Sequence, residues 1–287
     1  MRFQFIQHHA EQYRVNLMCS VLGVSRSGYY AWNKRQPSVR ERANRGLRAL
    51  IRLLHRKSRG TYGYRRVHAA LVAQGNTCGL NRVARLMREE GLRPRRRRGY
   101  KRTTQSRHNW PVAPNHLAQT FSATGPNEKW VTDITYIYTA EGWLYLAAVL
   151  DLYSRLVVGW AMEPFLTDTL TTKALKMAIA NRQPQPGLLH HSDRGSQYAS
   201  RSYQHLLSTH EALTSMSRTG NVYDNAPMES FFATLKKDLI HHRSYSTRRQ
   251  AKADIFEYIE VFYNRQRLHS ALGYLSPTAF ESLSVSP

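Results

Sequence analysis

Three acidic residues, each in a segment of a different kind, carry the strongest chemical signal in this sequence. Asp133 lies in an apolar, β-branched run at 130–138, Asp193 follows a short apolar stretch, and Glu229 lies in a helical pattern at 224–236. Hard cations such as Mg²⁺ take oxygen ligands, and carboxylates that converge from separate elements hold two of them about 3.5–4 Å apart. Such a pair stabilises the attacking and the leaving oxygen of a phosphoryl transfer. The sequence therefore predicts a metal-dependent nuclease or strand transferase.

The elements that must position these carboxylates form an α/β or α+β pattern from about residue 125. An acidic residue in the middle of a strand is disfavoured unless it faces solvent or binds something, because strands are depleted in Asp. We therefore interpret Asp133 as either a ligand or a solvent-facing residue. The pattern predicts three antiparallel strands and then alternating helix and strand, at 129–138, 143–151, 155–163, 167–180 (helix), 187–191, 200–210 (helix) and 213–217, followed by the Glu229 helix and a last helix at 251–266.

The positive charge is concentrated in one part of the chain. The net charge is +23, and residues 1–110 carry 26 Lys and Arg against 4 Asp and Glu, whereas residues 111–287 carry 16 against 15. Such a basic half indicates phosphate binding, with an affinity that falls as salt rises. The alternative is a solvated basic surface or a disordered tail. Apolar residues at helical spacing in the same region argue against that alternative.

The basic half divides into two helical segments. Residues 1–38 have a helix-turn-helix pattern of two short helices, in which Val15, Met18 and Leu22 share a face and Ser25 caps the second helix. Residues 39–95 predict a second helical DNA-binding domain with three apolar stripes, the last of which is stopped by Gly91 and Pro94. The opposite face of that last helix either enters a major groove or is merely solvated; it carries Asn81, Arg82, Arg85 and Arg88.

A basic run joins the helical part to the predicted α/β domain at 125–287. Residues 96–124 are polar, basic and without periodicity, which predicts an extended linker that lies along a DNA backbone. The candidate phosphate contacts at its start are Arg95, Arg96, Arg97 and Arg98.

Length, cysteine content and hydropathy exclude several classes. A chain of 287 residues predicts two or three domains. Cys19 and Cys78 stand alone, so neither a disulfide framework nor a cysteine-rich zinc site is expected, and a reducing cytoplasm is the expected compartment. No apolar run approaches the roughly 18 residues of a membrane span, and no signal-peptide core is present, so we expect a soluble protein.

Five sequence blocks follow one another along the chain. They are LGVSRSGYYAW at 22–32, TDITY at 132–136, HSDRGSQY at 191–198, YDNAPMESFF at 223–232 and the segment at 263–273. Asp193 and Glu229, in the third and fourth blocks, are separated by 35 residues, a spacing that adds specificity. In this order the blocks resemble the second-reading-frame transposases of the IS3 family of bacterial insertion sequences. This family lies in the DDE superfamily, which includes retroviral integrases.

The resemblance implies an RNase H-like mixed sheet with flanking helices, preceded by all-α helix-turn-helix units. It implies that Asp133, Asp193 and Glu229 are catalytic and hold two Mg²⁺ ions, for which Mn²⁺ may substitute, and that no covalent protein–DNA intermediate forms. The implied partners are double-stranded DNA (terminal inverted repeats and target), the upstream-frame product as a fusion, and further copies on DNA. The implied location is the bacterial nucleoid. The zinc domain of retroviral relatives has no counterpart here.

Three residues near the carboxylates are candidate DNA contacts. Lys236 lies seven residues after Glu229 and Asn225 lies four before it, so both fall on its helical face. In the family, a basic residue at the position of Lys236 is thought to grip the terminal DNA; the alternative is a solvated lysine beside Lys237. Arg194, next to Asp193, is the third candidate.

Several other polar residues have bland interpretations. His190 and His191 are disfavoured as metal ligands because hard-metal sites prefer oxygen, although either could contact the scissile phosphate. Asp224 is interpreted as a turn or cap residue, and Arg265 and Arg267 either contact DNA or anchor the last helix. Two rival functions remain: a DNA-binding regulator with an inactive catalytic domain, and an RNase H-like nuclease without strand transfer. The intact acidic triad argues against the first, and reaction products distinguish the second.

Overall fold

The computed structural model describes residues 1–95 and 112–284, in two compact units. The units are Met1–Leu53 and Leu54–Pro287, and the boundary falls inside helix α4 (Val39–Lys57). The predicted contacts Arg96, Arg97 and Arg98 and most of the linker lie outside the described residues.

The first unit contains three short helices ahead of α4, where the sequence predicts two. They are α1 (Arg2–His8), α2 (Val15–Val21) and α3 (Arg26–Lys34), packed around Ile6, Met18, Cys19 and Tyr29. The predicted cap is confirmed, because Ser25 Oγ accepts a hydrogen bond from Gly28 N at 3.0 Å. The prediction misses α1 because this helix of seven residues buries only Ile6, which leaves no apolar periodicity to detect.

The helical part of the second unit follows the predicted stripes. Helix α5 (Tyr64–Ala73) buries Val67 and Leu71, and it contacts α6 (Leu80–Glu89), which buries Val83, Leu86 and Met87. Gly91 adopts a positive φ of 66° just after α6, so the predicted stop is confirmed.

A five-stranded mixed sheet of order β3-β2-β1-β4-β5 forms the centre of the second unit. The long strands β1 (Lys129–Thr139), β2 (Gly142–Asp151) and β3 (Val157–Glu163) are antiparallel, as predicted. The short strands β4 (Leu189–Ser192) and β5 (Leu213–Met216) add in parallel to β1, and they are connected through α8 (Arg201–Thr209). The predicted mixed sheet is confirmed, and its parallel part pairs the first residues of β1 with β4.

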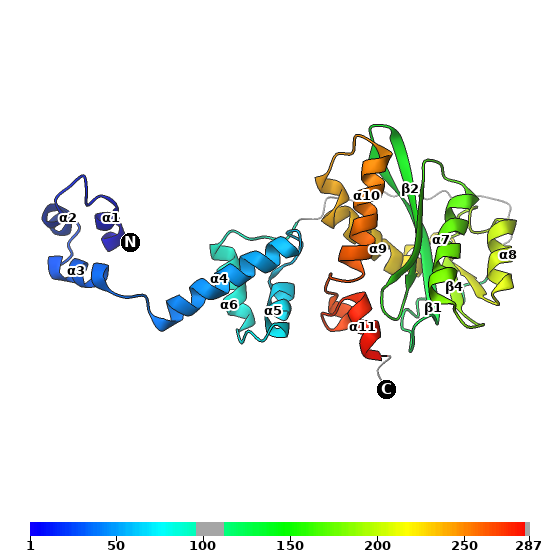
Figure 1. The fold of residues 1–287 in the computed structure, drawn as a ribbon, viewed down its shortest axis with the longest axis horizontal. Helices are drawn as coiled ribbons and strands as arrows, with labels where there is room; N and C mark the ends of the chain where they lie inside the picture. The colour runs from blue at the N-terminus through cyan, green and yellow to red at the C-terminus, as the bar shows by residue number, and fades with distance from the viewer. Residues whose placement is uncertain (96–111, 285–287) are drawn as a thin grey trace. The chain divides into compact units, whose positions relative to one another are not determined.

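Helices cover both faces of this sheet, which gives three layers (Figure 1). Helices α7 (Asp168–Arg182) and α8 pack on one face, while α9 (Ala226–Asp238), α10 (Arg248–Glu257) and the π-helix Tyr258–Tyr263 pack on the other. Gly159 on β3 permits the close approach of α7, since a Cβ there would lie 2.4 Å from the carbonyl oxygen of Ala174. Apolar residues of β1 and β2 therefore pack into two separate hydrophobic cores, one on each face of the sheet.

The C-terminal end contains more structure than the pattern predicts. The predicted helix at 251–266 is α10 continued by the π-helix, and a further helix, α11 (Pro277–Ser284), follows. Glu281 on α11 accepts two hydrogen bonds from Arg182 at the end of α7, at 2.8 and 2.9 Å. Among the described residues, no helix is both long and apolar enough to cross a membrane.

Candidate active site

The strand register places the two aspartates at the same level of neighbouring strands. On the parallel pair β1–β4, Val131 lies opposite His191. Asp133 and Asp193 each come two residues later, Asp133 within β1 and Asp193 just beyond the end of β4. Because parallel strands run in the same direction, equal offsets from a paired position place both residues at the same level of the sheet.

Short-range hydrogen bonds fix the backbone around both aspartates. Asp133 Oδ1 accepts from Ile134 N at 2.7 Å, and Asp193 Oδ1 accepts from Gly195 N at 2.8 Å. A Cβ on Gly195 would lie 3.0 Å from Asp193 Oδ1, which is tighter than ordinary contact. A larger residue at this position would therefore displace the aspartate side chain by a few tenths of an ångström.

A side-chain tether joins the Glu229 helix to β1. Glu229 lies exposed in the first turn of α9, which begins directly after the 3₁₀ turn Val222–Asn225. The side chain of Asn225, which is only 6% exposed, donates from Nδ2 to the carbonyl oxygen of Thr132 at 3.0 Å. Thr132 immediately precedes Asp133, so this hydrogen bond holds the start of the Glu229 helix against the strand that carries Asp133.

The three carboxylates affect one another electrostatically. Burial and the negative charges of Asp193 and Glu229 raise the pKa of Asp133 well above its usual value, while the hydrogen bond from Ile134 N and the charge of Lys236 oppose this rise. The side chains do not form a compact ligand cluster: among residues 1–95 and 112–284, no three His, Cys, Asp or Glu groups are arranged to hold a metal ion. All three are hard oxygen donors, the ligand type that Mg²⁺ prefers.

Asp224 anchors the loop that leads into α9, in agreement with its interpretation as a turn residue. Its buried carboxylate accepts from Arg218 N, Nε and Nη2 at 2.8, 3.1 and 2.9 Å. Asn115 Nδ2 and Gln119 Nε2, in the segment that precedes β1, each donate to it at 2.9 Å. The Arg218 hydrogen bonds hold the pKa of Asp224 well below its usual range, so the carboxylate stays charged in this network.

Lys236 lies next to the carboxylates, as its helical position predicts. Its Nζ lies 4.9 Å from the centre of the Tyr136 ring on β1. Burial lowers the pKa of Lys236, and the charge of Asp133 partly offsets this effect. The neighbouring Arg194 is fixed to the loop after β5, because its Nε donates to Ser217 O at 2.6 Å and its Nη1 donates to Thr219 Oγ1 at 2.5 Å.

The two histidines of β4 are buried and hydrogen-bonded to neighbouring hydroxyl groups. His190 Nε2 lies 3.1 Å from Tyr203 Oη, and the His191 ring nitrogens lie 2.8 and 3.1 Å from the hydroxyls of Ser215 and Ser217. Burial lowers the pKa of His190 to about 3 and that of His191 to about 4, so both are neutral at pH 7. These contacts give them a structural role in the core around β4.

The candidate DNA contacts of the helical part occupy different environments. Asn81 and Arg88 are exposed on α6, Arg82 is half-buried, and Arg85 Nη1 donates to Glu89 Oε1 at 2.9 Å. Arg95 donates through its guanidinium to the carbonyl oxygen of Asp238 at the end of α9. Of these five residues, Arg95 therefore has a contact within the catalytic part that the sequence pattern does not predict.

The two candidate arginines after the π-helix also differ in their surroundings. Arg265 is exposed, whereas Arg267 is 4% exposed and donates from Nε to Asp238 Oδ2 at 2.9 Å. Tyr258 Oη donates to the same carboxylate oxygen at 3.2 Å. Arg267 is thus the anchoring residue of the pair, and sequence spacing gives no signal for its partner Asp238, which lies 29 positions away.

Three family matches cover most of the chain. Residues 41–100 match a family described as "HTH-like domain", and residues 123–222 and 229–285 match two families that are each described as "Integrase core domain". The first match includes α5 and α6. The second includes the segments of Asp133 and Asp193, and the third begins at Glu229.

Curated relatives match over nearly the full length. The Escherichia coli (strain K12) protein named "Transposase InsF for insertion sequence IS3A" is 41% identical over 288 residues, which is 100% of both chains. The Shigella sonnei protein named "Insertion element IS600 uncharacterized 31 kDa protein" is 50% identical over 263 residues, which is 92% of this chain and 97% of that protein.

Solved structures with a similar fold come from retroviral systems. A chain of the simian T-cell lymphotropic virus intasome is 16% identical with a TM-score of 0.48, covering 76% of this chain and 70% of that one. The HTLV-2 integrase catalytic core domain, solved in complex with magnesium, is 15% identical with a TM-score of 0.43, covering 56% of this chain and 99% of that one.

Proposed function

This chain belongs to the IS3 family of DDE transposases, and we propose that Asp133, Asp193 and Glu229 are the catalytic residues of its DNA strand transfer. The observation that supports the proposal is the electrostatic effect of Asp193 and Glu229 on Asp133. Parallel pairing aligns Asp133 with Asp193, and the Asn225 tether brings the Glu229 helix to the same strand. Family membership makes the chain a polynucleotidyl transferase, and these three carboxylates are our candidates for its catalytic groups.

The same three residues would hold two Mg²⁺ ions, for which Mn²⁺ would substitute. Carboxylate oxygens suit both metals, and bound cations would offset the mutual repulsion that raises the pKa of Asp133. When bound, a metal pair supplies Lewis-acid stabilisation of the attacking and leaving oxygens. Lys236 contributes a positive charge near Asp133, where the phosphate of the DNA end would lie.

The reaction first hydrolyses one phosphodiester bond, which gives a 3′-hydroxyl and a 5′-phosphate, and then exchanges one phosphodiester bond for another. In cleavage, water attacks the phosphorus while the bond to the 3′ oxygen breaks, which leaves a free 3′-hydroxyl. In joining, that hydroxyl attacks a target phosphodiester and the target's own 3′ oxygen leaves. The three carboxylates position the reacting groups, and no bond to a protein side chain forms, which is why no serine or tyrosine need act as nucleophile.

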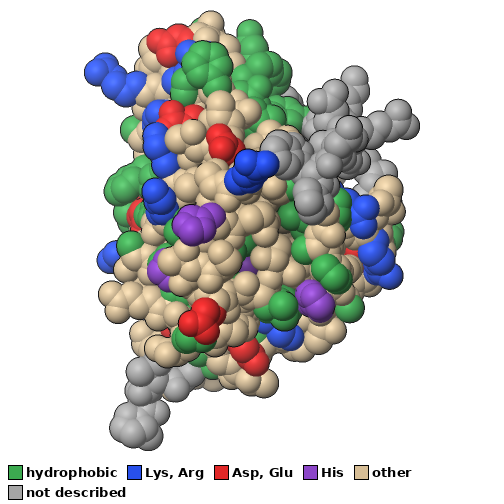
Figure 2. All heavy atoms as spheres, turned by 90° about the vertical axis from the view of Figure 1, so that its right-hand side faces the viewer, with side chains coloured by type: hydrophobic (Ala, Val, Ile, Leu, Met, Phe, Trp, Pro, Cys, Tyr) green, Lys and Arg blue, Asp and Glu red, His purple; other side chains and the backbone are tan. Residues whose placement is uncertain are grey.

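DNA binding is assigned mainly to the basic half of the chain. Residues 1–38 and 39–95 would bind the terminal inverted repeats, with the basic linker at 96–124 tracking the backbone toward the catalytic domain at 125–287. The view in Figure 2, toward the end where α8 lies in Figure 1, shows acidic and basic side chains interspersed among the residues that are described. Several copies on DNA, fusion to the upstream-frame product and action at the nucleoid complete the proposal.

A product assay tests this function. The full chain is incubated with a labelled duplex of the element's end and a supercoiled target, with Mg²⁺, Mn²⁺ or a chelator. We expect cleaved ends with free 3′-hydroxyls and joined products with either metal, and neither product with the chelator. Cleavage without joining would indicate a nuclease, and binding with no product would indicate a regulator; either result would contradict the proposal.

A further inference from the structure

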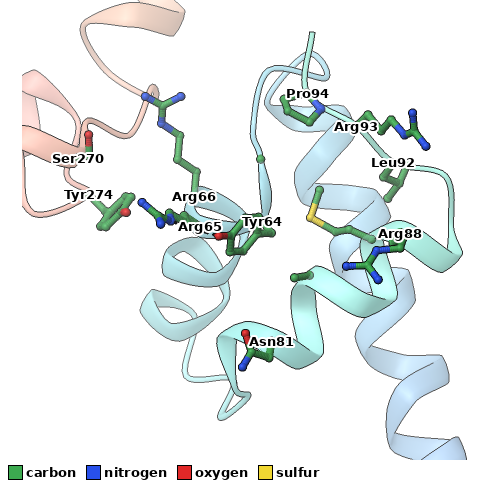
Figure 3. A pocket seen from close by; sticks show the side chains of 13 residues that line it. Tyr64, Arg65, Arg66, Asn81, Arg88, Leu92, Arg93, Pro94, Ser270 and Tyr274 are labelled. Atoms are coloured by element: carbon green, nitrogen blue, oxygen red, sulfur yellow. Dashed lines mark hydrogen bonds between the residues drawn. The ribbon is translucent and has the colours of Figure 1, made fainter. Parts of the chain in front are cut away.

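A basic pocket with a volume of about 810 Å³ lies between α5, α6 and the loop at 270–274 (Figure 3). Four of its lining residues are arginines, and no Asp or Glu belongs to the lining that the structure describes. Arg65 and Arg66 lie on the side next to Ser270 and Tyr274, and Arg88 lies across the pocket on α6. A cavity of this composition suits an anionic ligand.

Two of these arginines have described surroundings. Arg65 is exposed, and its Nε lies 3.4 Å from the Tyr64 hydroxyl. Burial and the charge of Arg267 lower the pKa of Arg66, although Asp238 acts in the opposite direction. A bound anion would stabilise the charged form of Arg66 in this setting.

Specific contacts fix the two walls of the pocket to each other. The Tyr62 hydroxyl, just ahead of α5, accepts from Leu268 N at 2.8 Å and donates to Gln266 O at 3.1 Å. The Arg59 guanidinium lies 4.6 Å from the centre of the Phe262 ring and donates to Glu257. Arg59 and Tyr62, which precede α5, therefore hold the helical wall of the pocket against the segment that leads to Ser270.

We propose that this pocket binds the phosphodiester backbone of a DNA end. Phosphate oxygens accept hydrogen bonds, and the pocket offers guanidinium groups from Arg65, Arg66 and Arg88 and a hydroxyl from Ser270. The volume exceeds that of a single phosphate group and accommodates a short stretch of backbone. The proposal rests on the proposed transposase function, and it adds the loop at 270–274 of the catalytic domain to the DNA-binding surface.

The pocket also separates the predicted contacts on α6 into two groups. Asn81 and Arg88 belong to its lining, whereas Arg82 and Arg85 do not. The first two would therefore contribute to backbone binding in the pocket, where they carry no sequence information directly.

Duplex binding by the full chain tests the pocket. Anisotropy of a labelled duplex of about 30 base pairs, measured in a chelator over a salt series, reports affinity without cleavage. Ser270→Glu places a negative charge in the pocket and should raise Kd about tenfold and lower the salt slope by about 0.9 for each lost phosphate contact. The matched control is Ser208→Glu, at an exposed position of α8, which should leave both Kd and the salt slope unchanged.

A second pair of variants guards against misfolding of Ser270→Glu. Arg65→Gln changes an exposed residue of the pocket, and Arg249→Gln makes the same charge change at an exposed position of α10. We expect the first to weaken binding severalfold more than the second. Equal Kd values and salt slopes within each pair would overturn the proposal. Because the assay contains no divalent metal, failure of the joining reaction would leave this result intact, and the two proposals fail separately.

Discussion

At the scale of single residues, hydrogen bonds to the backbone hold the segments that carry the three proposed catalytic carboxylates. Asp133 is held by its own strand, Asp193 by the turn that Gly195 permits, and Glu229 by the helix that Asn225 attaches to Thr132. Asn225 Oδ1 is buried and has no hydrogen-bond partner among the described residues. A buried polar atom without a partner costs about 1–3 kcal/mol of folding free energy, so this oxygen lowers the stability of the fold.

Asn225 therefore gives the first prediction, as a positioning residue. Asn225→Ala removes the hydrogen bond to Thr132 and should lower the joining rate by about 10- to 100-fold, because displacements near 1 Å at a reacting centre have effects of that size. The Kd for DNA should change by less than about twofold, a threshold near 0.4 kcal/mol. Asn221→Ala, in the same loop, is the control. Equal rates for the two variants in single-turnover joining would refute the role.

Lys236 and Lys237 give the second prediction. The two lysines are adjacent on α9 but rotated by about 100°, and the one near Asp133 should be the DNA contact. Lys236→Ala should depress joining and end-specific binding by about tenfold, roughly one lost charge-assisted contact, while Lys237→Ala does much less. Melting temperatures check that both variants fold. If the two substitutions reduce joining equally, Lys236 is ordinary surface charge.

The sequence identifies the candidate catalytic residues better than the residues that support them. Acidic type, spacing and block order single out Asp133, Asp193 and Glu229 as candidates, because all three signals can be read along the chain itself. The partners of Asp224 and Arg267 lie up to 109 positions away, in Asn115 and Asp238, and no local pattern encodes such pairs. Asn225 illustrates the limit: helical spacing suggests DNA contact, whereas its side chain is buried against Thr132.

At the scale of elements, the short strand β4 leads directly into Asp193 and pairs in parallel with β1, the longest strand. Its histidines lie in the core next to α8 and β5, and their neutral form is required there. The pattern predicts strands and amphipathic helices well, because each buries a periodic apolar face. The pattern misses α1 and α11, because their few buried residues give no apolar periodicity. It also does not reveal the π-helix that follows α10.

The buried histidine gives the third prediction, a loss of stability in acid. The folded-state pKa of His190 is about 3, below the ordinary value of 6.5, so the unfolded chain takes up a proton that the folded domain refuses as pH falls below 6.5. The contribution is absent above pH 6.5 and grows to about 2 kcal/mol at pH 5. The free energy of unfolding in urea, compared between pH 7.5 and pH 5, should therefore fall.

A substitution isolates this contribution from other acid effects. In His190→Gln, the drop in unfolding free energy between the two pH values should shrink by about 2 kcal/mol, whatever the substitution costs at pH 7.5. His205→Gln, on the exposed side of α8, serves as the control and should retain the full drop. An unchanged drop in the His190 variant would mean that the histidine is accessible to protons in the folded state.

At the scale of the whole molecule, charge and chemistry lie in different parts of the chain. The basic residues concentrate in 1–110, and the proposed catalytic carboxylates lie in the nearly neutral remainder. Removing one of these carboxylates should therefore abolish strand transfer without raising the Kd for DNA. This separation makes binding an internal control for every active-site substitution.

The most direct test measures joining and binding in the same three isosteric variants. Asp133→Asn, Asp193→Asn and Glu229→Gln should each lower Mg²⁺-dependent strand transfer by at least about a thousandfold, or roughly 4 kcal/mol of barrier, while Kd for the DNA end stays within about twofold of the unmodified chain. Lost joining with retained binding in all three would establish the triad. More than trace strand transfer by any one variant would contradict the assignment.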